Sequence, residues 1–132
     1  MRKSYIVSAK RTAIGSFLGG LATVKPKDMG SAVVKALLED AKVAPENVDE
    51  VICGNVLSAG LGQNIGRTIA LEAGIPETVC AHSVNMVCGS GLRTVMEAVM
   101  SIQCGFNDIV VAGGVESMSG APSLIPANTR TG

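Results

Sequence analysis

The sequence predicts an α/β protein in which a mainly parallel sheet lies between layers of helices. Three observations lead to this class. Short apolar runs of strand length alternate with stretches of helical periodicity. Loops rich in glycine or proline separate the two kinds of segment. The last apolar run is continuous, as in strands that are buried on both faces. The resulting order, β-α-β-α-β-α-β, favours parallel strands joined by right-handed crossovers.

The first half of the chain supplies two strands and one helix. Residues 5–9 (YIVSA) form a short strand candidate, and a long glycine-rich loop follows. A helix is expected from residue 27 or 28, because Pro26 suits a helix start. Its apolar residues recur at helical spacing: Met29, Val33, Val34, Leu37 and Leu38. The stretch PENVDE ends this helix, and residues 51–57 (VICGNVL) are the second strand candidate.

The second half repeats the alternation. A helix is expected from Ile65 to about Ala73, since Gly74 and Pro76 mark its end. Residues 80–87 are the third strand and residues 108–112 the fourth. The clearest helix runs from about residue 89 to 104, and its wide apolar face predicts that it is largely buried. That face consists of Leu92, Val95, Met96, Val99 and Met100. We expect the four strands to be neighbours in one sheet.

Composition excludes several classes of function. Apolar residues make up 47% of the 132 residues, and 11 basic residues balance 11 acidic ones. Without a basic patch or interleaved aromatic residues, nucleic-acid binding is not expected. The N-terminal segment lacks the apolar stretch of a signal peptide, and no run is long enough to cross a membrane. The sequence therefore predicts a cytoplasmic protein that does not bind membranes.

The cysteines give no metal site. Cys53, Cys80, Cys88 and Cys104 show no Cys-x-x-Cys spacing, and His82 is the only histidine. We expect reduced thiols that are mostly small buried hydrophobes, with Cys53 and Cys80 in the core. His82 is interpreted as an ordinary strand histidine.

Cys88 is the exception, because VNMVCGSGLRT places it between the end of a strand and the start of a helix. In parallel sheets, chemistry is found at the carboxyl ends of strands. A helix N-terminus favours a thiolate, and its amides can bind an oxyanion. Gly89 and Gly91 allow close approach of a substrate. This arrangement suits acyl transfer through a thioester on Cys88, while a packed cysteine in a tight turn remains the alternative.

A dinucleotide site is disfavoured at the same place. GSGLRT matches only half of a Gly-x-Gly-x-x-Gly loop, because Thr94 replaces the third glycine. The acidic residue expected after the next strand is missing, since Asp108 precedes that strand.

Four motifs together resemble the thiolase family: SAKRTAIGSF, GNVLSAGLGQNIGR, VNMVCGSGLRTV and VAGGVESMS. They occur in family order at family spacing, and the similarity runs from about residue 3 to about residue 119. The nearest resemblance is to the biosynthetic branch that condenses two acetyl-CoA reversibly to acetoacetyl-CoA and CoA. It implies that Cys88 carries the acetyl group and that CoA thioesters are substrates, with no further cofactor and no metal.

The resemblance also implies an architecture. Thiolases have two similar halves stacked in five layers, and a loop domain that binds CoA is inserted after the first half. Residues 1–119 would then be the N-terminal thiolase domain, and residues 120–132 would begin the inserted loop domain. Family members are dimers or tetramers. In them, the loop that matches residues 62–67 lies near the active site of the partner subunit.

The sequence departs from the family in what it lacks. A histidine in Gly-His-Pro, a second cysteine in Cys-x-Gly-Gly-Gly and an asparagine in Asn-Glu-Ala-Phe belong to the second half of thiolases, and none occurs in these 132 residues. The chain is therefore expected to be an N-terminal half that is inactive alone and that self-associates. The residues that bind substrate are not assigned.

Two alternatives remain open. Other condensing enzymes of the superfamily, such as ketoacyl synthases, share the strand–cysteine–helix layout, although VAGGVESMS favours a thiolase. A non-catalytic thiolase-like module that only binds a partner is the second alternative. The retained Cys88 argues against it, and a mass increase on incubation with an acyl-CoA would separate the two.

Overall fold

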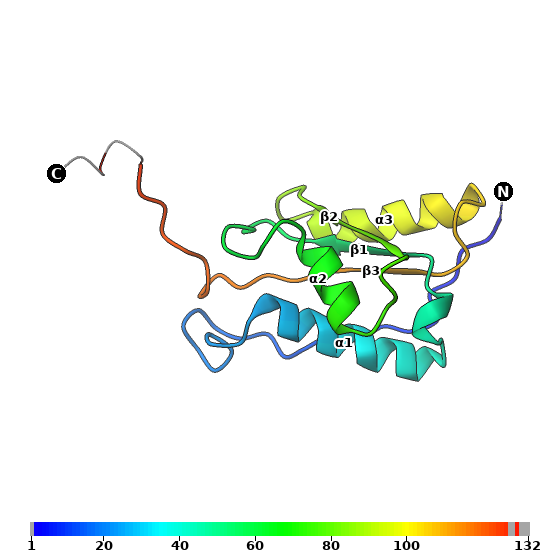
Figure 1. Ribbon diagram of the computed structural model, residues 1–132, viewed down its shortest axis with the longest axis horizontal. Coiled ribbons are helices and arrows are strands. Elements are labelled where there is room, and N and C mark those ends of the chain that lie inside the picture. Colours follow the sequence, from blue (N-terminus) through cyan, green and yellow to red (C-terminus); the bar gives the residue numbers. More distant parts are fainter. Residues whose placement is uncertain (1, 127–128, 130–132) are drawn as a thin grey trace.

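The computed structural model describes residues 2–126 and 129 and shows a three-stranded parallel sheet (Figure 1). Its strands are β1 (Glu50–Gly54), β2 (Cys80–Val84) and β3 (Val110–Gly114), in the order β2-β1-β3. Gly54 lies opposite Val84 on one side and Gly114 on the other. All three strands therefore end at one edge of the sheet, which we call the carboxyl edge.

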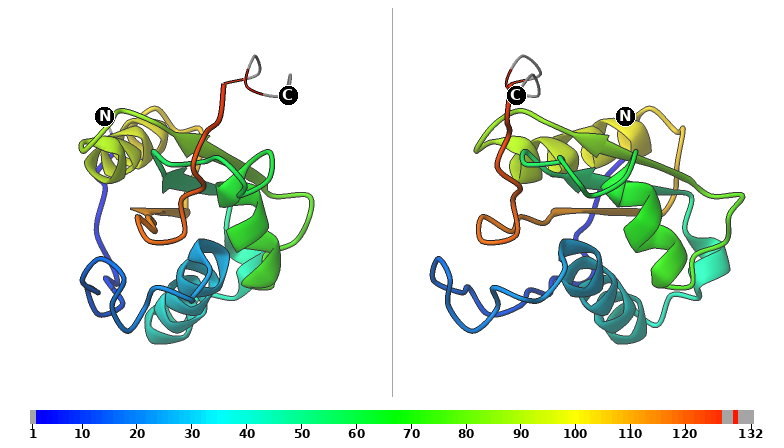
Figure 2. Two further views of the ribbon diagram at one scale, coloured as in Figure 1. Left: turned by 90° about the vertical axis from the view of Figure 1, so that its left-hand side faces the viewer. Right: turned by 60° about the vertical axis from the view of Figure 1, so that its left-hand side comes forward.

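Helices cover both faces of this sheet (Figure 2). Helices α1 (Pro26–Ala41) and α2 (Ile65–Glu72) lie on one side, and α3 (Ser90–Gln103) packs on the other. A short 3₁₀ turn, Pro45–Asn47, connects α1 to β1. The main core lies between the sheet and α1 and α2, with residues that include Val34, Leu38, Val51, Ile69, Ile75 and Val111. The layered α/β class with a parallel sheet is confirmed.

Helix ends follow the local sequence. Helix α1 has proline in its first turn and ends at Lys42, whose φ of 54° stops the helix. Helix α2 begins after Asn64, whose side-chain Oδ1 accepts a hydrogen bond from the Arg67 N–H at 3.2 Å. Gly74 takes a φ of 89° just past its end, where a side chain would be strained.

The prediction that residues 5–9 form a strand of the sheet is wrong. These residues are extended, but they pair with no strand among the described residues. Tyr5, Ile6 and Val7 are at least 73% exposed. The segment is held instead by α1, because Ser8 Oγ and Lys10 Nζ both contact the Asp40 carboxylate. A β-branched run predicts the extended backbone but not the partner that makes it a strand.

The prediction that the last helix is largely buried is also wrong. Only Ser90, Thr94 and Ala98 are buried in α3, on the side that faces the sheet. Another set of apolar residues on the helix remains exposed: Leu92 is 69%, Met96 48% and Met100 46% exposed. The apolar surface of α3 is therefore wider than the area that the sheet covers, and the helix is half-buried.

Beyond β3 the chain leaves the layered body at about residue 119 (Figure 1). The described part of this tail, residues 120–126 and 129, contains no helix longer than a single turn and no strand. The predicted beginning of a loop domain at residues 120–132 falls partly outside the described residues, since residues 127–128 and 130–132 are not described.

Candidate active site at the carboxyl edge of the sheet

Cys88 lies in the tight turn that joins β2 to α3, and it is exposed. The first residue of the helix shapes this turn. Ser90 Oγ accepts a hydrogen bond from the Met86 N–H at 2.8 Å and donates one to the Val87 carbonyl at 2.6 Å. Val87 adopts a φ of 52°, which is uncommon for a β-branched residue. The turn thus holds a strained backbone next to the thiol, with the side chain of Cys88 accessible.

The first turn of α3 presents unpaired backbone donors beside Cys88. No side chain caps this helix. Within residues 2–126 and 129, the N–H groups of Cys88, Gly91 and Leu92 have no hydrogen-bond acceptor. Such groups carry the positive end of the helix dipole. They are suited to bind negative charge that develops on a carbonyl oxygen attacked by the Cys88 thiolate.

Glycines allow α3 to approach the strand ends closely. A Cβ atom on Gly54 would lie 2.6 Å from the carbonyl carbon of Ser90, and one on Gly114 would lie 3.5 Å from Gly91 Cα. Thr94, which is fully buried, places its hydroxyl 3.1 Å from the Gly113 carbonyl oxygen. The N-terminus of α3 is therefore seated directly on the carboxyl ends of β1 and β3.

Asn55 and Glu116 tie the three strand ends together. The Glu116 carboxylate accepts hydrogen bonds from Asn55 Nδ2 at 2.8 Å, the Val56 N–H at 2.9 Å and the Leu57 N–H at 3.0 Å. The backbone N–H of Asn55 donates to the Val84 carbonyl at the end of β2. Asn55 is only 4% exposed, and its Oδ1 is buried without a partner within the described part of the chain. This cluster fixes the loops that surround the Cys88 turn.

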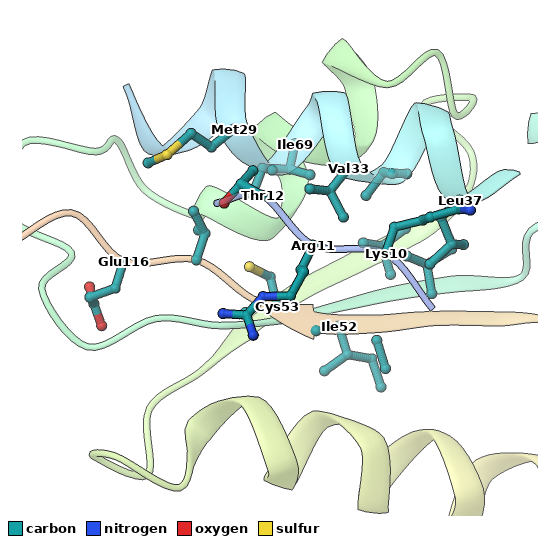
Figure 3. Close-up of a pocket in the computed structure, with 18 residues that line it drawn as sticks. Lys10, Arg11, Thr12, Met29, Val33, Leu37, Ile52, Cys53, Ile69 and Glu116 are labelled. Atoms are coloured by element: carbon teal, nitrogen blue, oxygen red, sulfur yellow. The ribbon is translucent and has the colours of Figure 1, made fainter. Parts of the chain in front are cut away.

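Cavities flank this region, and Cys88 lines none of those found among the described residues. One of about 210 Å³ lies at the carboxyl edge, next to the start of α2, and is lined by polar residues that include Asn55, Asn64, Ser83 and Asn85. Another of about 270 Å³ lies between α1 and the sheet, where Arg11, Cys53 and Glu116 line it (Figure 3). Burial raises the pKa of the Cys53 thiol to about 11, so Cys53 is protonated and unreactive.

The other sequence predictions about cysteine and histidine have mixed outcomes. Cys53 is buried as expected, but Cys80 and Cys104 are exposed, so the prediction of mostly buried thiols is wrong. Cys80 begins an edge strand, where only one side of the strand has a neighbour. His82 lies in β2 as predicted. Within the described residues there is no cluster that could hold a metal ion and no helix able to span a membrane.

The structure brings together motifs that are far apart in the sequence. Asn55 of GNVLSAGLGQNIGR contacts Glu116 of VAGGVESMS, and its N–H reaches Val84, where VNMVCGSG begins. Sequence reasoning did not find the Asn55–Glu116 pair, although both residues lie in motifs that it singled out. It also missed the contacts of His82 with Glu50 and Glu97, for which the sequence contains no signal.

Comparison with known proteins identifies the family of the chain. A model of the thiolase N-terminal domain matches residues 4–132. The acetyl-CoA acetyltransferase of Escherichia coli K12 is 54% identical over 132 residues, which is 100% of this chain and 34% of that protein. The cytosolic acetyl-CoA acetyltransferase of Mus musculus is 57% identical over 127 residues, covering 96% of this chain and 32% of that protein.

A solved structure shows the same fold. The Acat5 thiolase from Ascaris suum, crystallised in complex with coenzyme A, superimposes with a TM-score of 0.91 at 41% identity, covering 93% of this chain and 32% of that one. This chain thus spans about a third of the length of the relatives that it matches. The family model matches nearly the whole chain, the fold is that of a solved thiolase, and the motifs converge at one edge of the sheet. The chain therefore belongs to the thiolase family.

Proposed function

We propose that this chain supplies the acyl-carrying nucleophile of an acetyl-CoA acetyltransferase. The observation that carries the proposal is the exposed Cys88 beside the unpaired amides of α3, at the carboxyl edge of the sheet. The names of the relatives, acetyl-CoA acetyltransferase in both sequence comparisons, support the choice of acetyl-CoA as substrate. They also favour a thiolase over a ketoacyl synthase.

The proposed reaction has two steps. The Cys88 thiolate attacks the carbonyl carbon of acetyl-CoA, the carbonyl oxygen becomes an oxyanion, and CoA leaves as its thiolate, which takes up a proton. A second acetyl-CoA then loses a proton from its methyl group and attacks the acetyl thioester, which forms acetoacetyl-CoA and returns the Cys88 thiolate. The unpaired amides at the start of α3 are placed to stabilise negative charge on the oxygen.

In the family, proton transfer in these steps depends on a histidine in Gly-His-Pro and a second cysteine in Cys-x-Gly-Gly-Gly. Neither motif occurs in these 132 residues. We therefore expect this chain to be acetylated by acetyl-CoA but to show only background turnover. The remaining parts of the proposal follow the family. They are homo-oligomerisation with residues 62–67 near a partner's site, a cytoplasmic location, no cofactor beyond the CoA thioesters, and an inserted domain that begins near residue 120.

Acetylation of the chain tests this proposal. The protein is incubated with acetyl-CoA, and peptide mass spectrometry then locates any acetyl group bound as a thioester. We expect a hydroxylamine-labile acetyl group on Cys88 that is absent from Cys88→Ser and unchanged in Cys104→Ser, which removes another exposed thiol. An acetyl group on Cys80 or Cys104 instead, or no acetylation in any variant, would favour the non-catalytic binding module.

A further inference from the structure

The residue before Cys88 is held by a neighbouring side chain at its N–H and by another at its carbonyl. The Val87 N–H donates to Asn85 Oδ1 at 3.0 Å, and the Val87 carbonyl accepts a hydrogen bond from Ser90 Oγ at 2.6 Å. The same carbonyl also accepts one from the Ser90 N–H at 3.1 Å. Ser90 Oγ in turn accepts one from the Met86 N–H at 2.8 Å. We call Asn85 and Ser90 the Val87 clamp.

The Val87 carbonyl and the Cys88 N–H belong to the same peptide group. In a planar trans peptide, the C=O and N–H bonds point in opposite directions. Because Ser90 draws the Val87 carbonyl toward the first turn of α3, the Cys88 N–H points away from that turn. Within the described part of the chain, the N–H groups of Met86 and Val87 have side-chain acceptors, while that of Cys88 has no acceptor. The clamp thus leaves free the amide of the residue that bears the thiol.

The clamp acts against the preference of the backbone. Val87 has a φ of 52°, a left-handed value that β-branched residues rarely adopt. A return of Val87 to a negative φ would reorient the peptide groups on either side of it. Strained backbone of this kind persists only where its surroundings hold it in place. Here the surroundings are the hydrogen bonds of Ser90, which is 4% exposed, and of Asn85, which is exposed.

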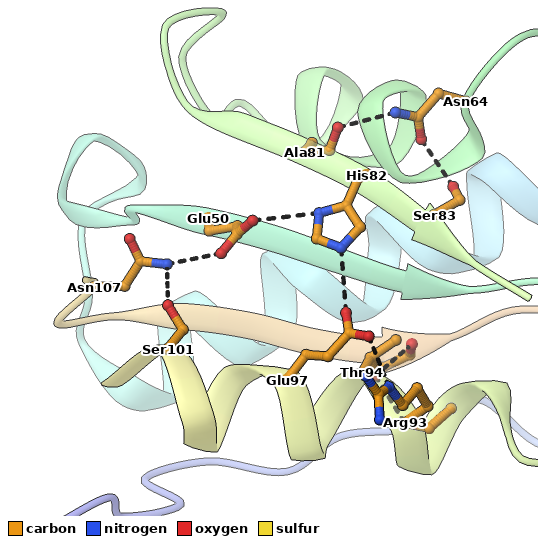
Figure 4. Close-up of polar contacts among 12 residues, drawn as sticks. Glu50, Asn64, Ala81, His82, Ser83, Arg93, Thr94, Glu97, Ser101 and Asn107 are labelled. Carbon is orange, nitrogen blue, oxygen red and sulfur yellow. Dashed lines mark hydrogen bonds and ion pairs between the residues drawn. The ribbon is translucent and has the colours of Figure 1, made fainter. Parts of the chain in front are cut away.

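Ser90 holds the turn from a rigid base. It begins α3, whose N-terminus is seated on the ends of β1 and β3. Thr94, one helical turn further along, is fully buried and places its hydroxyl 3.1 Å from the Gly113 carbonyl oxygen (Figure 4). The Ser90 hydroxyl is therefore fixed relative to the sheet, and its hydrogen bonds extend that fixed position to the turn.

We propose that Ser90 is a positioning residue. By holding the Val87 carbonyl, it turns the Cys88 N–H outward as a donor for the oxyanion that forms when the Cys88 thiolate attacks a thioester. Asn85 assists from the other side of Val87. This inference rests on the proposed function for the role of Cys88 as nucleophile. The conformation of Val87 can nevertheless be measured without any reaction.

Two reactions of the Cys88 thiolate separate the amide donor from the reactivity of the thiol itself. Alkylation by iodoacetamide displaces iodide from a CH₂ carbon and forms no oxyanion. Acetylation by p-nitrophenyl acetate passes through an oxyanion before p-nitrophenolate leaves, and this probe needs no CoA-binding site. A change in the exposure or ionisation of the thiol alters both rates. The ratio of acetylation to alkylation at Cys88, measured by peptide mass spectrometry, therefore reports the oxyanion donor.

The experiment compares the wild type with variants of the clamp. Ser90→Ala removes the buried hydroxyl. Asn85→Ala removes the other partner of Val87 at an exposed position, so this variant should fold and carries the test if Ser90→Ala does not. The double variant Ser90→Ala/Val87→Gly adds a residue that adopts a positive φ without strain. The matched control is Ser101→Ala, near the other end of α3, where Ser101 Oγ accepts a hydrogen bond from Asn107 Nδ2 (Figure 4).

We expect the ratio to fall about tenfold in Ser90→Ala, less than the roughly 100-fold or greater effect of deleting an oxyanion donor from a closed site. Asn85→Ala should lower it less, and Ser101→Ala should leave it unchanged. Adding Val87→Gly should restore the ratio to within about twofold of the wild type, since glycine adopts positive φ about as readily as negative φ. NMR couplings of the Val87 amide proton should show a positive φ in the wild type and its loss in Ser90→Ala.

Three results would overturn the inference. They are an unchanged ratio in both clamp variants, a Val87 that keeps its positive φ in Ser90→Ala, and a lowered ratio that Val87→Gly does not restore. Acetylation by acetyl-CoA, measured in parallel, separates this inference from the proposed function. Its absence from Cys88 of the wild type, with the ratios as expected, would contradict the proposed function alone. Equal acetylation by acetyl-CoA in the wild type and Ser90→Ala would contradict the positioning role alone.

Discussion

Each of the four cysteine side chains has a different environment, and these environments give the thiols different chemistry. Cys53 is buried beside the cavity under α1, while Cys80 begins an edge strand. Cys88 and Cys104 are both exposed and lie at opposite ends of the same helix. The N-terminal end of a helix stabilises an anion and the C-terminal end destabilises it. Comparing Cys88 with Cys104 therefore isolates the effect of the helix end from that of exposure.

Timed alkylation with iodoacetamide at pH 7.5 should modify Cys88 first. We expect it to react about threefold to thirtyfold faster than Cys104, because the field at each helix end contributes about 0.3–1 kcal/mol with opposite sign, a difference of about 0.6–2 kcal/mol. Cys53 should react last, since burial raises its pKa to about 11. Peptide mapping at each time point measures the order. Labelling of Cys104 ahead of Cys88 would contradict the assignment of Cys88 as the activated thiol.

Glu116 is a second side chain whose role can be tested alone. Glu116→Gln should lower the free energy of unfolding by about 1–3 kcal/mol. The substitution replaces one acceptor oxygen of the carboxylate by an NH₂ donor, so that at least one neighbouring donor loses its acceptor. Asn55 Nδ2, the Val56 N–H and the Leu57 N–H all donate to this carboxylate. Urea denaturation measures the change. The matched control is Glu77→Gln, an exposed carboxylate whose replacement should change stability by less than about 0.5 kcal/mol.

The way that α3 packs on the sheet depends on backbone contacts and not on large side chains. Gly54 and Gly114 let the first turn of the helix lie against the ends of β1 and β3. This contact places the helix N-terminus, and with it Cys88, at the carboxyl edge. The spacing of these elements leaves no room for a methyl group at Gly54, whose added Cβ would meet backbone atoms and not a movable side chain.

Gly54→Ala should therefore destabilise the protein by about 1–3 kcal/mol or prevent folding, because overpacking against backbone forces the helix to shift. Gly113→Ala is the control. It lies on the neighbouring strand opposite Cys53, and an added Cβ there would have nothing within 4 Å. Thermal unfolding of both variants measures the difference. Equal stability of Gly54→Ala and the wild type would show that α3 is not held in this position.

The elements that the sequence could predict are those with a local cause. Helix α2 was predicted close to its observed limits because Ile65 and Ile69 are periodic and Gly74 terminates the helix. The ends of β1 and β2 were predicted too late, at residues 57 and 87, because apolar residues continue past the point where pairing stops. The end of β3 was predicted two residues too early, at residue 112, because the strand continues through Gly113 and Gly114. Residues 5–9 and the exposed side of α3 were missed because both depend on which surfaces face a neighbour.

The candidate site shows the same division. The position of Cys88 between a strand and a helix was predictable, since one short stretch of sequence contains the strand end, the glycines and the helix start. The partners of His82 were not, because Glu50 is 32 positions away and Glu97 is 15 positions away, and only the folded sheet brings them to the ring. Asn55 and Glu116, separated by 61 positions, could be singled out only as members of family motifs.

On the scale of the whole molecule, apolar surface remains exposed at several places among the described residues. They include the apolar side of α3 formed by Leu92, Met96 and Met100, and the N-terminal segment with Tyr5, Ile6 and Val7. In addition, β3 has one edge without a strand partner among the described residues. Open strand edges and apolar patches of this kind promote association between chains.

The isolated chain should therefore self-associate in a concentration-dependent manner and bind a hydrophobic dye. Replacing Leu92 and Met96 together by lysine should lower dye binding and shift the mass from light scattering toward that of a single chain. The control is Thr78→Lys, at an exposed position outside α3, which should change neither the dye binding nor the mass. A monodisperse single chain without dye binding in the wild type would contradict this prediction.

The strand order β2-β1-β3 has a consequence for how the chain acquires its fold during synthesis. The central strand, β1, is made first but can pair only with strands that begin 30 and 60 positions later. The N-terminal segment forms its contacts later still, since Arg2 pairs with Asp108 and Ser4 Oγ donates a hydrogen bond to the Val99 carbonyl. Contacts between such distant positions slow folding, because a long loop must close before they form. On the ribosome, the apolar central strand would therefore emerge well before either neighbour can shield it, which makes the nascent chain a natural client for chaperones.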